Sequence, residues 1–223
     1  PNDAGCLQYI EDFLTQKGFI NETLTFGRVK NLWSVKRNNG PLLVFLGHVD
    51  VVPTGPENEW EHDPFSGYDD GTFINGRGTG DMKGGIACFM SALSRIDVDS
   101  LNYSIGFLIT ADEEGPSKDG TVKVVEELLQ RNEKIDFCLI GEPSTFETVG
   151  DNIRIGRRGS INIELEVLGK QGHAAYPARV DNPIHKVVPF LDKLLKEVWD
   201  EGNEHFPPTS LQLTNITAGV GAH

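Results

Sequence analysis

The sequence has little sulfur, and its cysteines are not spaced as a metal or redox motif. The 223 residues include three cysteines, Cys6, Cys88 and Cys138, which lie among apolar neighbours and form no CxxC pair. An odd number of such residues predicts reduced thiols in the core and not a disulfide framework. Because reduced thiols are typical of the cytoplasm, we expect a cytoplasmic protein.

Positive charge is also scarce. Lysine and arginine number 20 against 33 aspartates and glutamates, which gives a formal net charge of -13. A balance of this sign argues against nucleic acid and anionic membrane as partners. No apolar run approaches the ~20 residues that cross a bilayer. We therefore expect no nucleic-acid or membrane partner. A small-molecule substrate stays open, because a local cluster of lysine or arginine can outweigh the net charge.

The glycine-rich stretch "NGRGTGDMKGG" (75–85) lacks the signatures of nucleotide-binding loops. It has neither the GK[ST] ending of a P-loop nor the GxGxxG spacing of a dinucleotide site. Glycine at these positions instead indicates tight backbone geometry around Asp81. The sequence therefore gives no support for a phosphate-binding function here.

Apolar strands alternate with amphipathic helices in the first two thirds of the sequence. This alternation predicts an α/β fold, with a mainly parallel sheet and helices on both faces. The predicted elements are a helix within 2–18, strand material at 24–36, strands at 42–46, 103–110 and 135–140, and helices at 84–95 and 119–131.

The pattern changes in the last third of the chain. Residues 161–169 alternate apolar and polar side chains, as in a sheet with one wet face. Residues 183–199 predict a helix with one apolar side, and 210–216 predict a further strand. We therefore divide the chain into a first domain, 1–158, and the beginning of a smaller α+β domain, 159–223.

Side chains that can bind a metal follow three of the predicted strands. In parallel sheets, ligands collect beyond the carboxyl ends of the strands. Imidazole nitrogen and carboxylate oxygen suit zinc, and a catalytic zinc keeps one position open for water. The candidate ligands, from four separate segments, are His48, Asp81, Glu114 and Glu142.

Three further residues are candidates for the site, and two of them, Asp50 and Glu113, have two interpretations each. Asp50 leaves its strand on the same side as His48 and is a candidate to orient the imidazole, or it caps a turn. Glu113 precedes Glu114, and adjacent side chains point in different directions, so one can bind metal while the other accepts a proton. The alternative for this pair is a charged surface loop. His173, in "GKQGHAAYP", is by itself an ordinary loop histidine.

Four motifs, taken in order and spacing, resemble those of the metallopeptidase M20 family of co-catalytic zinc hydrolases. They are "GHVDVVPTG", "GRGTGDMKGG", "TADEEGPSKDG" and "IGEPS", and the resemblance covers essentially the whole chain. It implies a zinc-exopeptidase-like catalytic domain, here incomplete, followed by an incomplete dimerisation or lid domain. It also implies two Zn²⁺ ions per subunit, with Co²⁺ as a possible substitute, and a homodimer formed through the second domain.

The resemblance also implies roles for the candidate metal ligands. Asp81 would bridge the two ions. His48 and Glu142 would complete the protein ligands of the first ion, and Glu114 would bind the second. Glu113 would be the general base.

Other residues would act around the metal ions. Asp50 would orient His48, and His173 would reach across the dimer to stabilise the oxyanion. Arg157 would bind the substrate carboxylate, with Arg158 as the less favoured choice. Tyr176 is a second candidate for substrate binding.

The stretch from 156 to 186, "GRRGSINIELEVLGKQGHAAYPARVDNPIHK", narrows the substrate within the family. It most resembles members that hydrolyse N-succinyl-LL-2,6-diaminopimelate to succinate and diaminopimelate in bacterial lysine and diaminopimelate biosynthesis. Deacetylation of N-acetylornithine and aminoacylase activity are the alternatives.

One part of the family pattern has no match. The family supplies a final histidine ligand from a later segment, and His223 does not match that motif. We therefore expect that the chain is truncated at its C-terminus and inactive as given. A non-catalytic metal-binding fragment is the remaining alternative.

Overall fold

The computed structural model describes residues 3–219, so His223 lies outside the described residues. The chain forms two compact units, Pro1–Ile153 and Arg154–His223. Among the described residues, no helix has the length and apolar character needed to cross a membrane.

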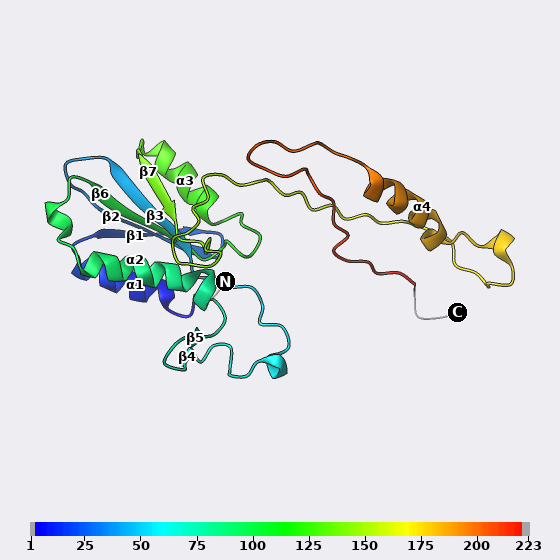
Figure 1. The fold of residues 1–223 in the computed structure, drawn as a ribbon, viewed down its shortest axis with the longest axis horizontal. Coiled ribbons are helices and arrows are strands. Elements are labelled where there is room, and N and C mark those ends of the chain that lie inside the picture. The colour runs from blue at the N-terminus through cyan, green and yellow to red at the C-terminus, as the bar shows by residue number, and fades with distance from the viewer. Residues whose placement is uncertain (1–2, 220–223) are drawn as a thin grey trace. The chain divides into compact units, whose positions relative to one another are not determined.

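The first unit is built on a five-stranded sheet with the strand order β1-β2-β6-β3-β7 (Figure 1). β3 pairs in parallel with β6 and β7, whereas β2 pairs antiparallel with β1 and β6. Four strands therefore run in one direction and β2 runs against them, which confirms the mainly parallel sheet. The strands are β1 (Ile20–Phe26), β2 (Val29–Lys36), β3 (Leu42–His48), β6 (Ser104–Thr110) and β7 (Phe137–Ile140).

Helices cover both faces of this sheet, as the sequence predicts. Figure 1 shows α1 (Cys6–Gln16) and α2 (Gly84–Ser94) on one face and α3 (Thr121–Gln130) on the other. Because strand side chains alternate between faces, Phe45 and Phe107 pack with α1 and α2, while Val44 and Leu108 pack with α3. Two hydrophobic layers thus fix β3 and β6 at the centre of the sheet.

Short elements fill the connections of the first unit. The predicted strand material at 24–36 belongs to the β1–β2 hairpin, whose two strands pair from Phe26 and Val29 outward. The remaining elements are η1 (Glu57–Glu59), β4 (Tyr68–Asp69), β5 (Ile74–Asn75), η2 (Thr79–Lys83) and η3 (Val98–Ser100).

The second unit contains η4 (Pro177–Arg179) and α4 (Pro183–Lys196). The side chain of Asn182 caps α4 by accepting a hydrogen bond from the N–H of Ile184. The strands predicted at 161–169 and 210–216 are wrong, because the described residues form no strand there. A strand needs a hydrogen-bonded neighbour, and the bridge between Lys170 and Asp181 is the one isolated pairing in this part of the described chain.

Candidate metal centre

The candidate ligands meet at the carboxyl edge of the sheet, because three parallel strands end there. β3 ends at His48, opposite Thr110 at the end of β6. Glu113 and Glu114 follow β6, and Glu142 follows β7. β3 lies between these two strands, so the side chains that follow all three lie close together.

Asp81 reaches the same edge from η2, just before α2. The first turn of α2 lies against the chain that follows β7. A Cβ atom at Gly85 would be 2.3 Å from the carbonyl oxygen of Gly141, so this approach requires glycine. The close packing brings Asp81 towards Glu142, the residue after Gly141.

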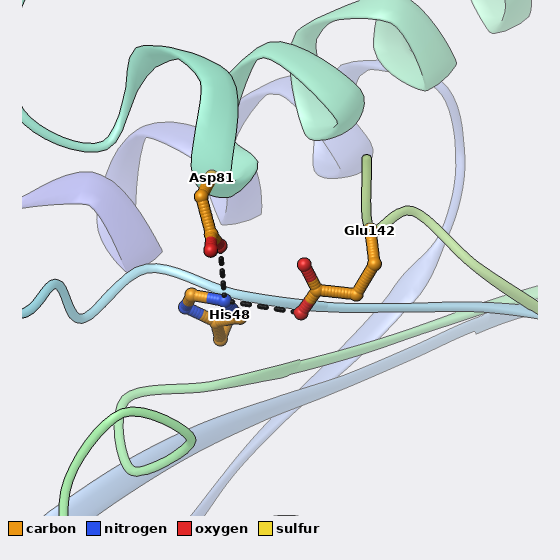
Figure 2. A group of neighbouring side chains, drawn as sticks. All are labelled: His48, Asp81 and Glu142. Carbon is orange, nitrogen blue, oxygen red and sulfur yellow. Dashed lines mark hydrogen bonds and ion pairs between the residues drawn. The ribbon is translucent and has the colours of Figure 1, made fainter. Parts of the chain in front are cut away.

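His48 is the centre of the cluster, and its side chain is 1% exposed. Figure 2 shows one nitrogen of the imidazole facing the carboxylates of both Asp81 and Glu142. The Nε2 atom lies 3.1 Å from Asp81 Oδ1 and 3.2 Å from Glu142 Oε1. Glu113 Oε2 is 3.8 Å from the same nitrogen.

These atoms are spaced as metal ligands. The ligand atoms of His48, Asp81 and Glu142 lie within 4.8 Å of one another, and so do those of His48, Glu113 and Glu114. A tetrahedral zinc ion with bonds of about 2.1 Å holds its ligands about 3.4 Å apart. The separations around His48 Nε2 are close to this value, so the residues present fit one such ion.

The carboxylates of the cluster carry an unfavourable concentration of negative charge. Burial, followed by the charge of Asp81, raises the pKa of Glu142, and the same two causes raise the pKa of Glu114. Among the described residues, no lysine or arginine forms an ion pair with either carboxylate. A bound cation would supply the missing positive charge.

The protonation state and tautomer of His48 also depend on its surroundings. Burial disfavours the imidazolium, but the hydrogen bond to Asp50 and the charges of Glu142, Asp50 and Glu113 outweigh it and raise the pKa of His48. Nδ1 donates to the carbonyl oxygen of Asp50 at 2.9 Å. In the neutral ring this bond leaves the Nε2 lone pair facing the carboxylates, the orientation that a metal ligand needs.

The side chain of Asp50 makes different contacts from those expected. Its Oδ1 atom is 3.6 Å from His48 Nδ1, longer than the contact made by its own carbonyl oxygen. The carboxylate instead accepts the backbone N–H groups of Glu113, at 3.0 Å, and Glu114, at 2.9 Å. Asp50 therefore joins the end of β3 to the turn that carries both glutamates.

The other candidates lie in the second unit, and their roles remain predictions. His173, Tyr176, Arg157 and Arg158 are exposed. The Nδ1 atom of His173 accepts the N–H of Ala175 at 3.0 Å, and its ring centroid is 5.6 Å from that of Tyr176. These contacts organise the loop around His173 within its own unit.

Sequence reasoning missed two residues that support the cluster. The backbone N–H of His48 donates to the sulfur of Met82, whose side chain is buried at 1% exposure. Asp112, beside the two glutamates, is 7% exposed and turns its carboxylate inward. The sequence shows three consecutive acidic residues, but it does not show that the first of them is buried.

Comparison with known proteins defines the class of this chain. Residues 44–217 match the profile of peptidase family M20/M25/M40, and the chain belongs to this family. It is 53% identical over 225 residues to a succinyl-diaminopimelate desuccinylase of Marinobacter nauticus and 52% identical to that of Hydrogenovibrio crunogenus. Each alignment covers 100% of this chain and 60% of the relative, so the chain spans about three fifths of their length.

Solved structures support the fold. Human carnosine dipeptidase 1 aligns with a TM-score of 0.54 at 22% identity, covering 60% of this chain and 31% of that one. The M20 family metallo-carboxypeptidase Sso-CP2 from Sulfolobus solfataricus gives a TM-score of 0.53 at 23% identity, with the same two coverages. At these identities the likeness confirms the predicted fold class.

Proposed function

We propose that the protein containing this chain hydrolyses the amide bond of N-succinyl-LL-2,6-diaminopimelate, which gives succinate and LL-2,6-diaminopimelate for lysine and diaminopimelate biosynthesis in bacteria. The observation that carries this proposal is identity of about one half, over the whole chain, to relatives named for this activity. The buried His48 among carboxylates supports it, because a metal-assisted hydrolase needs such a cluster.

The metal in this proposal is zinc, with two ions per subunit and Co²⁺ as a substitute. His48, Asp81 and Glu142 would hold one ion, and Asp81 with Glu114 would hold the other. When bound, the metal polarises the amide carbonyl and lowers the pKa of water from 15.7 towards about 7.

Glu113 is the proton carrier of the reaction. Its carboxylate takes a proton from the attacking water, whose oxygen bonds to the succinyl carbonyl carbon. It then gives that proton to the amide nitrogen as the carbon–nitrogen bond breaks, so the amine leaves neutral. Glu113 suits this role because its Oε2 lies at the edge of the cluster, farther from His48 Nε2 than the nearest oxygens of Asp81 and Glu142.

Several parts of the proposal concern the second unit and the assembly. His173 would stabilise the oxyanion in the partner subunit of a cytoplasmic homodimer. Arg157 and Tyr176 would bind the substrate. We propose that residues 1–223 alone bind metal but are inactive, since the first ion's ligands are present and the relatives are longer.

Turnover assays on the full-length protein test the substrate. We expect kcat/KM for N-succinyl-LL-2,6-diaminopimelate to exceed that for N-acetylornithine by at least about 100-fold. A site built to bind the succinyl carboxylate discriminates strongly against an acetyl group, which lacks it. N-acetyl amino acids are the second comparison. A preference for N-acetylornithine or for N-acetyl amino acids would replace the proposed substrate within the same family.

A further inference from the structure

The loop from 112 to 119, between β6 and α3, carries Glu113 and Glu114 and is held from inside by a buried carboxylate. Asp112 Oδ2 accepts the backbone N–H groups of Lys118 and Asp119, both at 2.9 Å. Its Oδ1 accepts the N–H of Ser117 at 3.3 Å. Three consecutive backbone donors thus converge on one side chain that is 7% exposed.

Both ends of this loop are tied to the sheet. The N–H of Asp112 donates to Thr110 Oγ1 at 3.1 Å, at the last residue of β6. The carbonyl oxygen of Asp119 accepts a hydrogen bond from Asn31 Nδ2 at 3.0 Å. Asn31 and Thr110 are partners in the β2–β6 ladder, so the two ends are anchored side by side.

Between these anchors the loop is closely packed at Gly115 and tied across by Ser117. A Cβ atom at Gly115 would lie 2.9 Å from Asp112 Oδ1. The hydroxyl of Ser117 donates to the carbonyl oxygen of Glu113 at 2.5 Å. On the other side, the Asp50 carboxylate holds the N–H groups of Glu113 and Glu114. The backbone of both glutamates is therefore bonded directly to Asp50, and Ser117 links Glu113 to the part of the loop that Asp112 holds.

We propose that Asp112 is a positioning residue for the amide hydrolysis proposed above, on which this inference rests. Asp112 fixes the backbone of the loop and so keeps the carboxylate of Glu113 at the reacting atoms. The role needs a carboxylate, because all three groups facing it are donors. An asparagine would turn an NH₂ group towards at least one N–H and could not accept all three bonds.

The variant Asp112→Asn in the full-length protein tests this inference. In the metal-free protein, we expect amide hydrogen exchange at residues 113–119 to accelerate at least about 10-fold, while β3 and β6 stay protected. With zinc bound, we expect kcat to fall about 10- to 100-fold and KM to change less than about threefold, because displacement of a reacting group near 1 Å costs about this much.

Asp97→Asn is the matched control. Asp97 also accepts a backbone N–H, from Asp99, but it caps η3 before the start of β6, at the opposite edge of the sheet. We expect this control to leave exchange at 113–119 and both kinetic constants within about twofold of wild type. If Asp112→Asn does not fold, Ser117→Ala replaces it, because this variant removes the hydroxyl bond to Glu113. It should also accelerate exchange at 113–119 and lower kcat, by smaller factors.

The two measurements separate failure of this inference from failure of the proposed function. Unchanged exchange at 113–119 in Asp112→Asn overturns the positioning role, whatever the substrate is. Faster exchange with an unchanged kcat also overturns it and leaves the hydrolase proposal standing. If the wild-type protein does not hydrolyse the succinyl substrate, the same comparison of kcat is made with the substrate that it does hydrolyse.

Discussion

The two units of the chain differ in how much they bury. In the first unit, Phe45 and Phe107 are 2% and 0% exposed, with helices packed over the sheet. None of the described residues from 154 to 219 is buried. Apolar residues of α4 such as Val188 and Phe190 are 57% and 48% exposed.

This difference shows where a precise site can form. Metal ligands must be held to within a fraction of an ångström, which requires packed neighbours. His48 has such neighbours, because the core of the first unit packs beneath β3. His173 lies on a loop with local contacts alone among the described residues, so its proposed role requires a second surface to place it.

Removal of the proposed base should have the largest effect, and it tests the better-packed unit. We expect Glu113→Gln in the full-length protein to lower kcat by about 10²- to 10⁴-fold, the usual contribution of general acid–base catalysis. Zinc content, measured by atomic emission, should stay at the wild-type level. Glu126→Gln, on the exposed side of α3, is the control and should keep full activity. Loss of zinc in parallel with activity would make Glu113 a ligand.

Truncation of one aromatic residue in each unit tests the comparison through stability. Phe107 packs against Phe19, Phe45 and Phe89, so Phe107→Ala should cost about 3–5 kcal/mol of unfolding free energy. Phe190→Ala in α4 should change it by less than about 0.5 kcal/mol. Urea denaturation followed by tryptophan fluorescence measures both. Equal losses of unfolding free energy would mean that α4 is buried in the full-length protein. The difference in burial between the two units would then not hold for α4.

The role of His173 can be tested by mixing two inactive variants. We expect His173→Ala to lower turnover about 10²- to 10³-fold, as loss of an oxyanion donor does. A heterodimer of this variant with Glu113→Gln has one site with an intact base and an intact histidine from the partner. Activity should then recover to about half of wild type per heterodimer. No recovery in verified heterodimers would exclude action across the dimer.

Much of the site could be predicted because it depends on strand direction. Parallel strands bring their carboxyl ends to one edge, so His48 and Glu142 could be placed together from their positions after apolar runs. The position of the Asp50 carboxylate could not be predicted from the sequence as accurately. β3 ends at His48, and beyond the strand the rule that residues i and i+2 share a face no longer holds. As a result, the carbonyl oxygen of Asp50 lies closer to the imidazole than its carboxylate does.

The second unit was less predictable because its expected strands depend on distant partners. Alternation at 161–169 describes a side-chain pattern, but a ladder also requires a neighbouring strand in register. The helix at 183–199 was easier, since its hydrogen bonds are local, and α4 ends three residues earlier, at Lys196. The burial of Asp112 likewise depends on residues distant in the sequence, and three consecutive acidic residues do not reveal it.

The smallest expected effect concerns an ion pair that joins two elements of the first unit. Arg131, after α3, donates to both carboxylate oxygens of Glu22 on β1, at 2.6 and 2.9 Å. The hydrogen bond from Arg131 lowers the pKa of Glu22 from its ordinary value of 4.5. A lowered pKa in the folded state stabilises the protein above pH 4.5, and this contribution is lost as the pH falls through the folded value.

Glu22→Gln should therefore lower the urea midpoint slightly at pH 7, and the difference from wild type should close as the pH falls below 4.5. The difference is small because both side chains are about two fifths exposed and water screens the pair. Glu57→Gln, in a 3-10 turn without a buried residue, controls for the loss of one surface carboxylate. A difference that stays constant between pH 7 and pH 3 would show that Glu22 acts through packing and not through its charge.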